Sequence, residues 1–478
     1  MINPWDPDEF RRAGHALVDL LADRLKTLPD GPVWQPVPDA ERNALRADPL
    51  PAAPTGPTDL IAEFATRVMP HPMGNGHPAF FGWVNSSPHP AGVLGEFAAA
   101  AMGPSCAGGD QAGVHLEYGV IAQLADLVGY PAGAGLLVSG GSTASLTALA
   151  AARHAAALAD GWDVRAEGLT DKPRLVVYAS PETHSCVRKS AELLGLGAIH
   201  VVPGGDRFDV AALREAIAAD RAAGLRPFAV AASAGTVNTG LVDPLDDLAD
   251  LCAAEGLWLH VDGAYGAFGR LDPELADAYS GLERADSLAL DPHKWPGVPV
   301  GCGAVLVRDP GILQETFSAV APYLRNEPGE GFGGGMWLAE LGFEQSRPFR
   351  ALPAWMTLRA MGREGLADMV VRHNRLAREL AASLTGLPDF ALAAEPGLSV
   401  VCFRHEPAGM SQLEVDDLNR RLPARVQTRG EVFLTGTVLD GRPVLRACVL
   451  NRDTGPEHVA RIPAAVRAAA ATLREETP

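Results

Sequence analysis

Residues 288–297 read LALDPHKWPG, and they place one lysine directly after an apolar run that has the pattern of a β-strand. Lys294 is flanked by histidine, tryptophan and proline. An ammonium group held among apolar neighbours loses solvation, which lowers the pKa of the lysine and makes its neutral, nucleophilic amine accessible. Such an amine can attack a carbonyl, so the stretch predicts Schiff-base chemistry at Lys294.

Other short apolar runs, separated by helical patterns, place this strand in a larger sheet. We expect strands at 174–178, 198–202, 228–232, 257–261, 287–290 and 304–308, with helices such as 210–223 and 244–255 between them. Strands that are apolar on both faces and alternate with helices are typical of a parallel sheet covered by helices on both sides. The sequence therefore predicts an α/β fold with its site at the carboxyl ends of the strands.

The region before this sheet is different. Apolar residues recur at helical spacing over 8–28, a proline-rich linker covers 29–57, and a second helical pattern covers 58–69. A lone amphipathic helix before such a linker has no core of its own. We therefore expect its apolar face to pack on a second subunit.

The region after the sheet indicates a smaller lobe. The elements expected there are a helix at 354–384, strands within 390–403 and 432–449, and a closing helix at 456–474. This pattern is typical of a small α+β domain. We predict an N-terminal helical dimerisation segment at 1–76, a large α/β domain at 77–350 and a small C-terminal domain at 351–478.

Composition narrows the classes of partner. The 478 residues carry a formal net charge of −18 and no basic run, which argues against nucleic acid or an anionic membrane and favours a small molecule. The start has no signal-peptide pattern, and no apolar stretch is long enough to cross a bilayer, so we expect a cytoplasmic protein. The six cysteines are far apart without a C-x-x-C pair, which predicts free buried thiols and no metal site.

A glycine-serine turn stands before another expected helix. Ser139-Gly140-Gly141-Ser142-Thr143 follows an apolar run and opens a helical pattern. Backbone N–H groups at such a turn, with the helix dipole behind them, can hold a phosphate. The alternative is a tight strand-to-helix connection with no ligand.

An acid ends the strand at 257–261. Asp262 could ligate a metal, cap the next segment, or pair with a protonated ring nitrogen. Ala264, two residues later, leaves room for a flat ring against the backbone. None of these alternatives is decided by Asp262 alone.

Two further polar residues follow strands at the same edge of the sheet. His184 comes shortly after the strand at 174–178, where an imidazole could stack on a conjugated ring or remain a solvated loop residue. Thr236 follows the strand at 228–232. A phosphate cradle, an acid at a strand end, a stacking histidine and an activated lysine are together the groups that hold pyridoxal 5′-phosphate (PLP).

The sequence resembles the group II PLP-dependent decarboxylases, the aromatic-L-amino-acid and glutamate decarboxylase family. The resemblance is carried by His77-Pro78-Ala79-Phe80-Phe81, Glu117, Gly141-Ser142, His184, the HVDGAYG motif at 260–266, the DPHKW motif at 291–295, 347–355 and Val444-Leu445-Arg446. It covers most of the chain. It implies the fold type I PLP-transferase fold with a mostly parallel seven-stranded sheet in the large domain, and a homodimer with active sites at the subunit interface.

The resemblance also implies roles for individual residues. Lys294 would form the Schiff base with the cofactor, Asp262 would pair with its pyridine nitrogen, and His184 would stack on its ring. The remaining cofactor contacts would come from Gly141, Ser142, Thr236, Ala264, Asp291 and His293, and the substrate contacts from Trp83, Val84, Asn85, Ser86 and Arg446.

One departure from the family concerns the product. Family decarboxylases carry a mobile loop whose tyrosine protonates Cα after CO2 is lost, but the corresponding loop at 326–346 contains no tyrosine. Phe332 is the nearest aromatic substitute, and Tyr323 matches a different family position. Relatives with phenylalanine there resemble aldehyde synthases, in which the unprotonated carbanion reacts with O2.

We therefore expect an enzyme that removes the α-carboxylate of an L-amino acid through an external aldimine and a quinonoid, giving an amine or, by O2-dependent oxidative deamination, an aldehyde. Two alternatives remain open. The cofactor could serve β-elimination, aldol cleavage or transamination, or the chain could be a catalytically decayed regulatory or scaffold relative.

Overall fold

The computed structural model describes residues 6–319, 332 and 337–476. By internal contacts the chain divides into two compact units, Met1–Trp83 with Glu379–Ala393 and Cys402–Pro478, and Val84–Arg378 with Ala394–Val401. The second unit holds the large sheet, and the first holds the N-terminal helices and most of the C-terminal elements.

The large sheet has seven strands in the order β1-β7-β6-β5-β4-β2-β3. Their bounds are β1 Ala134–Val138, β2 Leu175–Ala179, β3 His200–Val201, β4 Arg226–Ser233, β5 Trp258–Asp262, β6 Ser287–Leu290 and β7 Gly303–Val307. The pairs β6–β5, β5–β4, β4–β2 and β2–β3 are parallel, whereas β7 runs antiparallel to both β1 and β6. The predicted α/β class and the mostly parallel seven-stranded sheet are confirmed.

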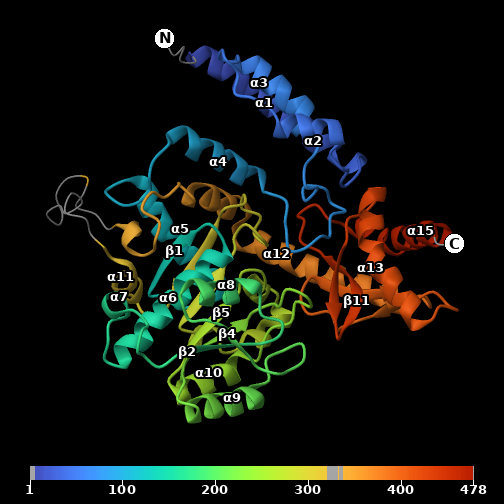
Figure 1. Cartoon of the computed structure of the whole chain (residues 1–478). Coiled ribbons are helices and arrows are strands. Elements are labelled where there is room, and N and C mark those ends of the chain that lie inside the picture. The colour runs from blue at the N-terminus through green and yellow to red at the C-terminus, as the bar shows by residue number, and fades with distance from the viewer. Residues whose placement is uncertain (1–5, 320–331, 333–336, 477–478) are drawn as a thin grey trace. The chain divides into compact units, whose positions relative to one another are not determined.

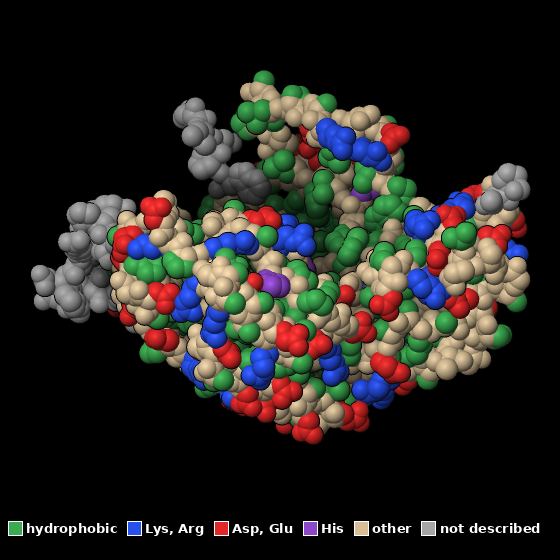
Figure 2. All heavy atoms as spheres, turned by 60° about the horizontal axis from the view of Figure 1, so that its bottom comes forward, with side chains coloured by type: hydrophobic (Ala, Val, Ile, Leu, Met, Phe, Trp, Pro, Cys, Tyr) green, Lys and Arg blue, Asp and Glu red, His purple; other side chains and the backbone are tan. Residues whose placement is uncertain are grey.

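Helices surround this sheet, as Figure 1 shows. Their bounds are α4 Pro90–Met102, α5 Ala112–Val128, α6 Gly141–Ala159, α7 Val164–Glu167, α8 Ser185–Leu193, α9 Val210–Ala222, α10 Leu245–Glu255 and α11 Ile312–Phe317. Helix α6 packs along the sheet because its inner face is rich in alanine, including Ala144, Ala148 and Ala151, which are completely buried. On the face with α9 and α10, acidic and basic side chains are interspersed (Figure 2).

The expected helix at 354–384 is interrupted. Helix α12 spans Ala351–Thr385, but Gly362 has a φ of 66°, which is left-handed and breaks the regular helical backbone at that residue. Glycine tolerates this conformation because it has no Cβ. The long helical stretch expected at 354–384 is therefore present, with a kink at Gly362.

The small sheet has the strand order β10-β11-β9-β8. Its strands are β8 Phe390–Leu392, β9 Val400–His405, β10 Thr435–Leu439 and β11 Arg442–Cys448, and its helices are α13 Gln412–Arg429, α14 Pro456–Val459 and α15 Ile462–Glu475. The closing helix expected at 456–474 is thus divided into α14 and α15. The expected α+β character of this region is confirmed.

The N-terminal region contains more structure than its proline content suggested. It forms α1 Pro7–Thr27, α2 Asp39–Arg46 and α3 Pro57–Glu63, which continues as a π-helical turn at Phe64–Val68. Helix α2 lies inside the segment that we predicted to be a linker. Arg67 explains its order, since its guanidinium donates to Glu41 at 3.0 Å and to Asp48 at 3.0 Å.

Two expectations from composition can be compared with the described residues. All six cysteines lie in the described part of the chain, where they are buried and form no disulfide, as predicted. Within that part, no helix combines the length and the apolar character needed to span a membrane.

Candidate active site

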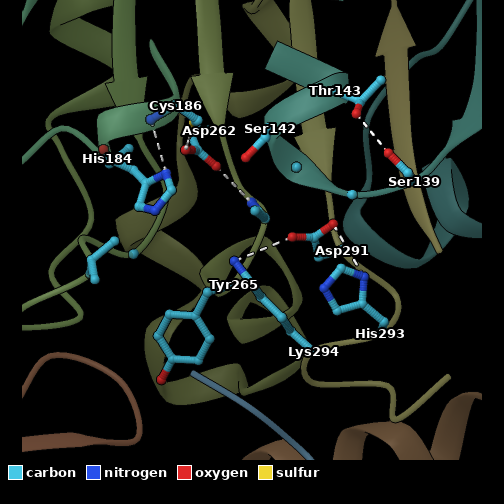
Figure 3. A pocket seen from close by; sticks show the side chains of 16 residues that line it. Ser139, Ser142, Thr143, His184, Cys186, Asp262, Tyr265, Asp291, His293 and Lys294 are labelled. Carbon is cyan, nitrogen blue, oxygen red and sulfur yellow. Dashed lines mark hydrogen bonds and ion pairs between the residues drawn. The ribbon is translucent and has the colours of Figure 1, made fainter. Parts of the chain in front are cut away.

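A cavity of about 320 Å³ lies at the carboxyl ends of the parallel strands (Figure 3). Its lining residues are Ser139, Gly140, Gly141, Ser142, Thr143, His184, Cys186, Ser233, Gly235, Val237, Asp262, Ala264, Tyr265, Asp291, His293 and Lys294. They come from the ends of four strands and from the first turns of α6 and α8. Eight of the residues named from the sequence therefore meet in one place: Gly141, Ser142, His184, Asp262, Ala264, Asp291, His293 and Lys294.

The start of α6 forms one wall. Gly140 is its N-cap, and no described side chain caps the first backbone N–H groups of the helix. A Cβ on Gly141 would lie 2.9 Å from the Cβ of Ala264 and 2.9 Å from Oδ2 of Asp291, so only glycine leaves this wall open. Free N–H groups at the positive end of a long helix are suited to an anion.

Lys294 enters the cavity from a tight turn after β6. Its backbone N–H donates to the carbonyl of Asp291 at 2.8 Å, and its Nζ lies 3.2 Å from Oδ2 of Asp291. The ammonium therefore has a carboxylate partner. The flanking sequence had suggested apolar surroundings, and the structure does not show them. The apolar neighbour Trp295 points elsewhere, where it stacks on Tyr265 at a centroid distance of 5.0 Å and donates to His373.

Asp291 and His293 belong to the same turn. Oδ1 of Asp291 is buried and has no hydrogen-bond partner among the described groups. Nδ1 of His293 lies 2.8 Å from the carbonyl oxygen of Cys302. A carbonyl can only accept, so Nδ1 carries a proton.

Asp262 lies at the end of β5 with both carboxylate oxygens engaged. Oδ1 accepts from the backbone N–H of Ala264 at 3.1 Å, and Oδ2 lies 3.7 Å from Sγ of Cys186. Cys186 was not predicted as a site residue because a cysteine in a helix usually serves as a small apolar side chain. Ligand atoms of His184, Cys186 and Asp262 lie within 4.8 Å of one another, a grouping that could also hold a metal ion.

His184 is the N-cap of α8, and its Nδ1 accepts from the backbone N–H of Cys186 at 3.2 Å. The neutral ring must then carry its proton on Nε2. Partial burial, the largest effect, lowers the pKa of His184, although Asp262 opposes it. The imidazole is therefore neutral near pH 7 and can donate through Nε2.

Thr236 is placed differently from the other predicted cofactor contacts. Its side chain is buried, lies 2.9 Å from Oγ1 of Thr239 and accepts from the N–H of Leu241 at 3.1 Å. It does not line the cavity, whereas its neighbours Gly235 and Val237 do. The Thr236 hydroxyl thus stabilises the turn after β4.

The predicted substrate stretch does not line this cavity either. Trp83 has a left-handed φ of 47°, and its carbonyl accepts from the guanidinium of Arg446 at 2.9 Å. Ser86 donates to the carbonyl of His293 at 3.2 Å and so supports the turn that carries Lys294. Val84 is buried and Asn85 is partly buried.

The position of the loop at 326–346 is described only in part. Tyr323 and residues 326–331 and 333–336 lie outside the described residues. Phe332 is exposed, and its carbonyl accepts from the N–H of Asp110 at 2.8 Å. Its ring lies against Gly109, and it is not among the residues that line the cavity.

Comparison with known proteins agrees with this geometry. Residues 39–406 match the pyridoxal-dependent decarboxylase conserved domain. The chain is 33% identical over 476 residues to an aromatic-L-amino-acid decarboxylase of Bacillus atrophaeus, covering 97% of this chain and 96% of that protein. It is 30% identical over 477 residues to a phenylacetaldehyde synthase of Arabidopsis thaliana, covering 96% and 95%.

A solved structure is similar over nearly the whole chain. The crystal structure of Oryza sativa TDC with PLP and tryptamine has a TM-score of 0.90 and 28% sequence identity, and the match covers 99% of this chain and 100% of that chain. The family resemblance and the fold expected from it are thus confirmed. The chain belongs to the pyridoxal-dependent decarboxylase family of enzymes, whose cofactor is pyridoxal 5′-phosphate.

Proposed function

We propose that this enzyme removes the α-carboxylate of an aromatic L-amino acid. The observation that carries the proposal is the meeting of Lys294, Asp262, His184 and the uncapped start of α6 around one cavity. The aromatic class is supported by relatives at 30% identity or more, including the Bacillus enzyme and a tyrosine decarboxylase of Arabidopsis thaliana that is 31% identical over 482 residues.

The residues around the cavity fit PLP. The start of α6 offers backbone donors for the phosphate, and Gly140 and Gly141 leave its wall open. In the chain without cofactor, the Asp291 carboxylate beside this wall has Nζ of Lys294 as a partner at 3.2 Å. Asp262 supplies a second carboxylate to the cavity lining, as a protonated pyridine nitrogen requires.

When bound, PLP supplies an electron sink for the bond that breaks at the substrate Cα. Lys294 would hold the cofactor covalently through its amine, and Asp262 would keep a proton on the pyridine nitrogen. His184 would lie against the ring. Because its Nδ1 is occupied by the N–H of Cys186, only Nε2–H is available to donate to a substrate carboxylate.

Absorbance and product analysis test this assignment. The purified protein should show a visible absorbance band that Lys294→Ala abolishes, and it should release CO2 from one or more amino acids in an aromatic panel. Lys189→Ala is the matched control, because Lys189 lies on α8 and does not line the cavity. A wild-type protein that stays colourless with added PLP, or that consumes amino acids without releasing CO2, would contradict the proposal.

The second candidate is an aldehyde product, favoured by the absence of tyrosine from the loop at 326–346. In that reaction one O2 and one water are consumed per amino acid, and CO2, ammonia, hydrogen peroxide and the aldehyde are released. The carbanion electrons reduce O2 to peroxide, and water hydrolyses the resulting imine. The Arabidopsis phenylacetaldehyde synthase shows that aldehyde formation occurs among relatives at 30% identity.

Oxygen uptake separates the two products. An aldehyde synthase consumes one O2 per CO2, whereas a decarboxylase releases one amine per CO2 without oxygen. Phe332→Tyr should shift the products towards amine if Phe332 occupies the protonating position. Phe343→Tyr is the control, since Phe343 is equally exposed and lies in the same loop. Amine formation without oxygen uptake in the wild type would reject the aldehyde candidate.

We also propose that the enzyme is a homodimer. Within the described chain, α1 buries no residue, and its apolar side chains Phe10, Val18 and Leu25 are about half exposed. Light scattering should give twice the mass of one chain, and Val18→Asp with Leu25→Asp should weaken the dimer. A monomeric wild type would refute this proposal. Six cysteines without a disulfide fit a reducing compartment, so the cytoplasmic location remains our prediction.

A further inference from the structure

A continuous series of buried and partly buried side chains with polar atoms leads through the protein to Asp262. The steps are Trp258 Nε1 to Ser287 Oγ at 2.7 Å, Ser287 Oγ to His260 Nδ1 at 3.0 Å, His260 Nε2 to Ser145 Oγ at 3.2 Å, Ser145 Oγ to Cys186 Sγ at 3.8 Å and Cys186 Sγ to Asp262 Oδ2 at 3.7 Å. Only the last two residues line the cavity. We call these six residues the Asp262 chain.

The fold brings these residues together from four elements. Trp258, His260 and Asp262 alternate along β5, and Ser287 pairs with His260 across the β5–β6 register. Ser145 comes from α6 and Cys186 from α8. Ser145, His260 and Ser287 are completely buried, so water does not compete for their hydrogen bonds.

Elementary donor rules allow the first half of the Asp262 chain to run from Trp258 towards Ser145. An indole N–H can only donate, so Ser287 accepts from Trp258 and its own hydroxyl proton is free to go to Nδ1 of His260. Desolvation lowers the pKa of His260 to about 4, which keeps its ring neutral. A neutral imidazole that accepts at Nδ1 must carry its proton on Nε2, which donates to Ser145.

The second half continues in the same direction. The thiol of Cys186 faces two oxygens, Oγ of Ser145 and Oδ2 of Asp262, but it carries one proton. When Ser145 accepts from His260, its own hydroxyl proton can go to Sγ, which leaves the thiol proton for Asp262. In the contact between Cys186 and Asp262 the thiol is the donor and Oδ2 the acceptor. Burial raises the pKa of Cys186 to about 12, which keeps the proton on sulfur.

We propose that Cys186 is a positioning residue that fixes the Asp262 carboxylate by donating its thiol proton to Oδ2, and that Trp258, Ser287, His260 and Ser145 set the direction of that bond. The inference rests on the proposed role of Asp262 as the partner of the pyridine nitrogen. Ala264 holds the other oxygen through its backbone, so the two bonds together leave the carboxylate one orientation.

The tautomer of His260 is the first test, and it does not depend on the cofactor. Nitrogen-15 NMR of the apoprotein, assigned with His260→Gln, should show a neutral His260 with its proton on Nε2. Ser287→Ala removes the donor to Nδ1 and should shift the population towards the Nδ1–H tautomer. A wild-type ring protonated on Nδ1, or on both nitrogens at pH 7, would overturn the proposal.

The thiol bond is the second test. The infrared S–H band of Cys186, isolated by difference against Cys186→Ala, should move when Asp262→Asn replaces the charged acceptor by a neutral one. An unchanged band would show that the thiol donates elsewhere and would overturn the proposal. This readout also uses the apoprotein.

Cofactor affinity is the third test. Cys186→Ala should weaken PLP binding by roughly three- to tenfold, because a hydrogen bond to a charged group is lost, whereas Cys186→Ser should retain most of it. Cys252→Ala is the matched control, since Cys252 is a buried thiol on α10 outside the cavity. Equal affinities for Cys186→Ala and Cys252→Ala would overturn the proposal. If Asp262→Asn itself leaves PLP affinity unchanged while the NMR and infrared results hold, the assigned role of Asp262 fails and the hydrogen-bond chain stands.

Discussion

Removing the charge of Glu117 should lower the free energy of unfolding more than removing a carboxylate charge at the protein surface. Glu117 on α5 and Arg347 are each 1% exposed and form a bidentate pair, with NH2 to Oε1 at 2.6 Å and NH1 to Oε2 at 3.2 Å. Arg347 also donates to the carbonyls of Cys106 and Leu137. Glu117 in turn accepts from the N–H of Leu137 at 2.9 Å.

The magnitude follows from burial. Glu117→Gln keeps the shape and one acceptor oxygen but leaves the guanidinium of Arg347 buried without a counter-charge, which costs about 3 to 5 kcal/mol in the free energy of unfolding. The exposed pair of Asp23 and Lys26 has side chains that are about three-quarters exposed. Asp23→Asn should therefore cost at most about 1 kcal/mol.

Urea unfolding of the apoprotein, followed by tryptophan fluorescence, measures both variants. A double variant, Glu117→Gln with Arg347→Met, completes a cycle in which the two changes should cost less together than their sum, because no charge is then left unpaired. PLP affinity should also fall in Glu117→Gln, since Leu137 belongs to the strand that leads into the cradle at 139–143. If Glu117→Gln costs no more than Asp23→Asn, the reasoning is refuted.

Two further predictions concern the cavity and its support. Gly141→Ala should weaken PLP binding by roughly 1 to 3 kcal/mol in a fluorescence titration, because its Cβ would lie 2.9 Å from Ala264 and from Asp291. The control is Gly119→Ala on α5, where nothing lies within 4 Å of the new Cβ, so that PLP binding should stay unchanged. The pKa of His260 is lowered to about 4 in the fold but is about 6.5 when unfolded, so the unfolded state binds more protons and the free energy of unfolding should rise by up to about 3 kcal/mol from pH 4 to pH 7. His260→Gln should remove that part of the slope in urea unfolding across this range, and an unchanged slope would count against a buried neutral His260.

The large sheet could be predicted because its strands are apolar on both faces. Six of the seven strands coincide with apolar runs, and all of β2, β4, β6 and β7 is buried except Arg226. The antiparallel direction of β7 was less visible. It follows from the short connection between Leu290 and Gly303, which has no helix. A parallel strand would need such a crossover to return the chain to the opposite end of the strands.

Sequence reasoning placed the residues at the strand ends but missed those that helices bring in. Asp262 and Lys294 follow directly from β5 and β6, whose carboxyl ends lie together in any parallel sheet. Cys186 and Ser145 meet Asp262 only because α6 and α8 pack on the same part of the sheet, and this packing leaves no pattern in either segment. The position of Thr236 depended in the same way on the turn that follows β4.

The environment of Lys294 shows how neighbours in sequence differ from neighbours in space. Trp295 suggested an apolar setting, yet its ring turns away to stack on Tyr265. The residues that matter are Asp291 and Pro292, since aspartate at the first position and proline at the second are typical of a type I turn. Such a turn closes with a hydrogen bond from the fourth N–H to the first carbonyl, as Lys294 and Asp291 form at 2.8 Å. The same closure brings the carboxylate to within 3.2 Å of the ammonium. The ion pair between Lys294 and Asp291 could therefore be predicted from the sequence DPHK at 291–294 if this stretch is interpreted as a turn that follows the strand.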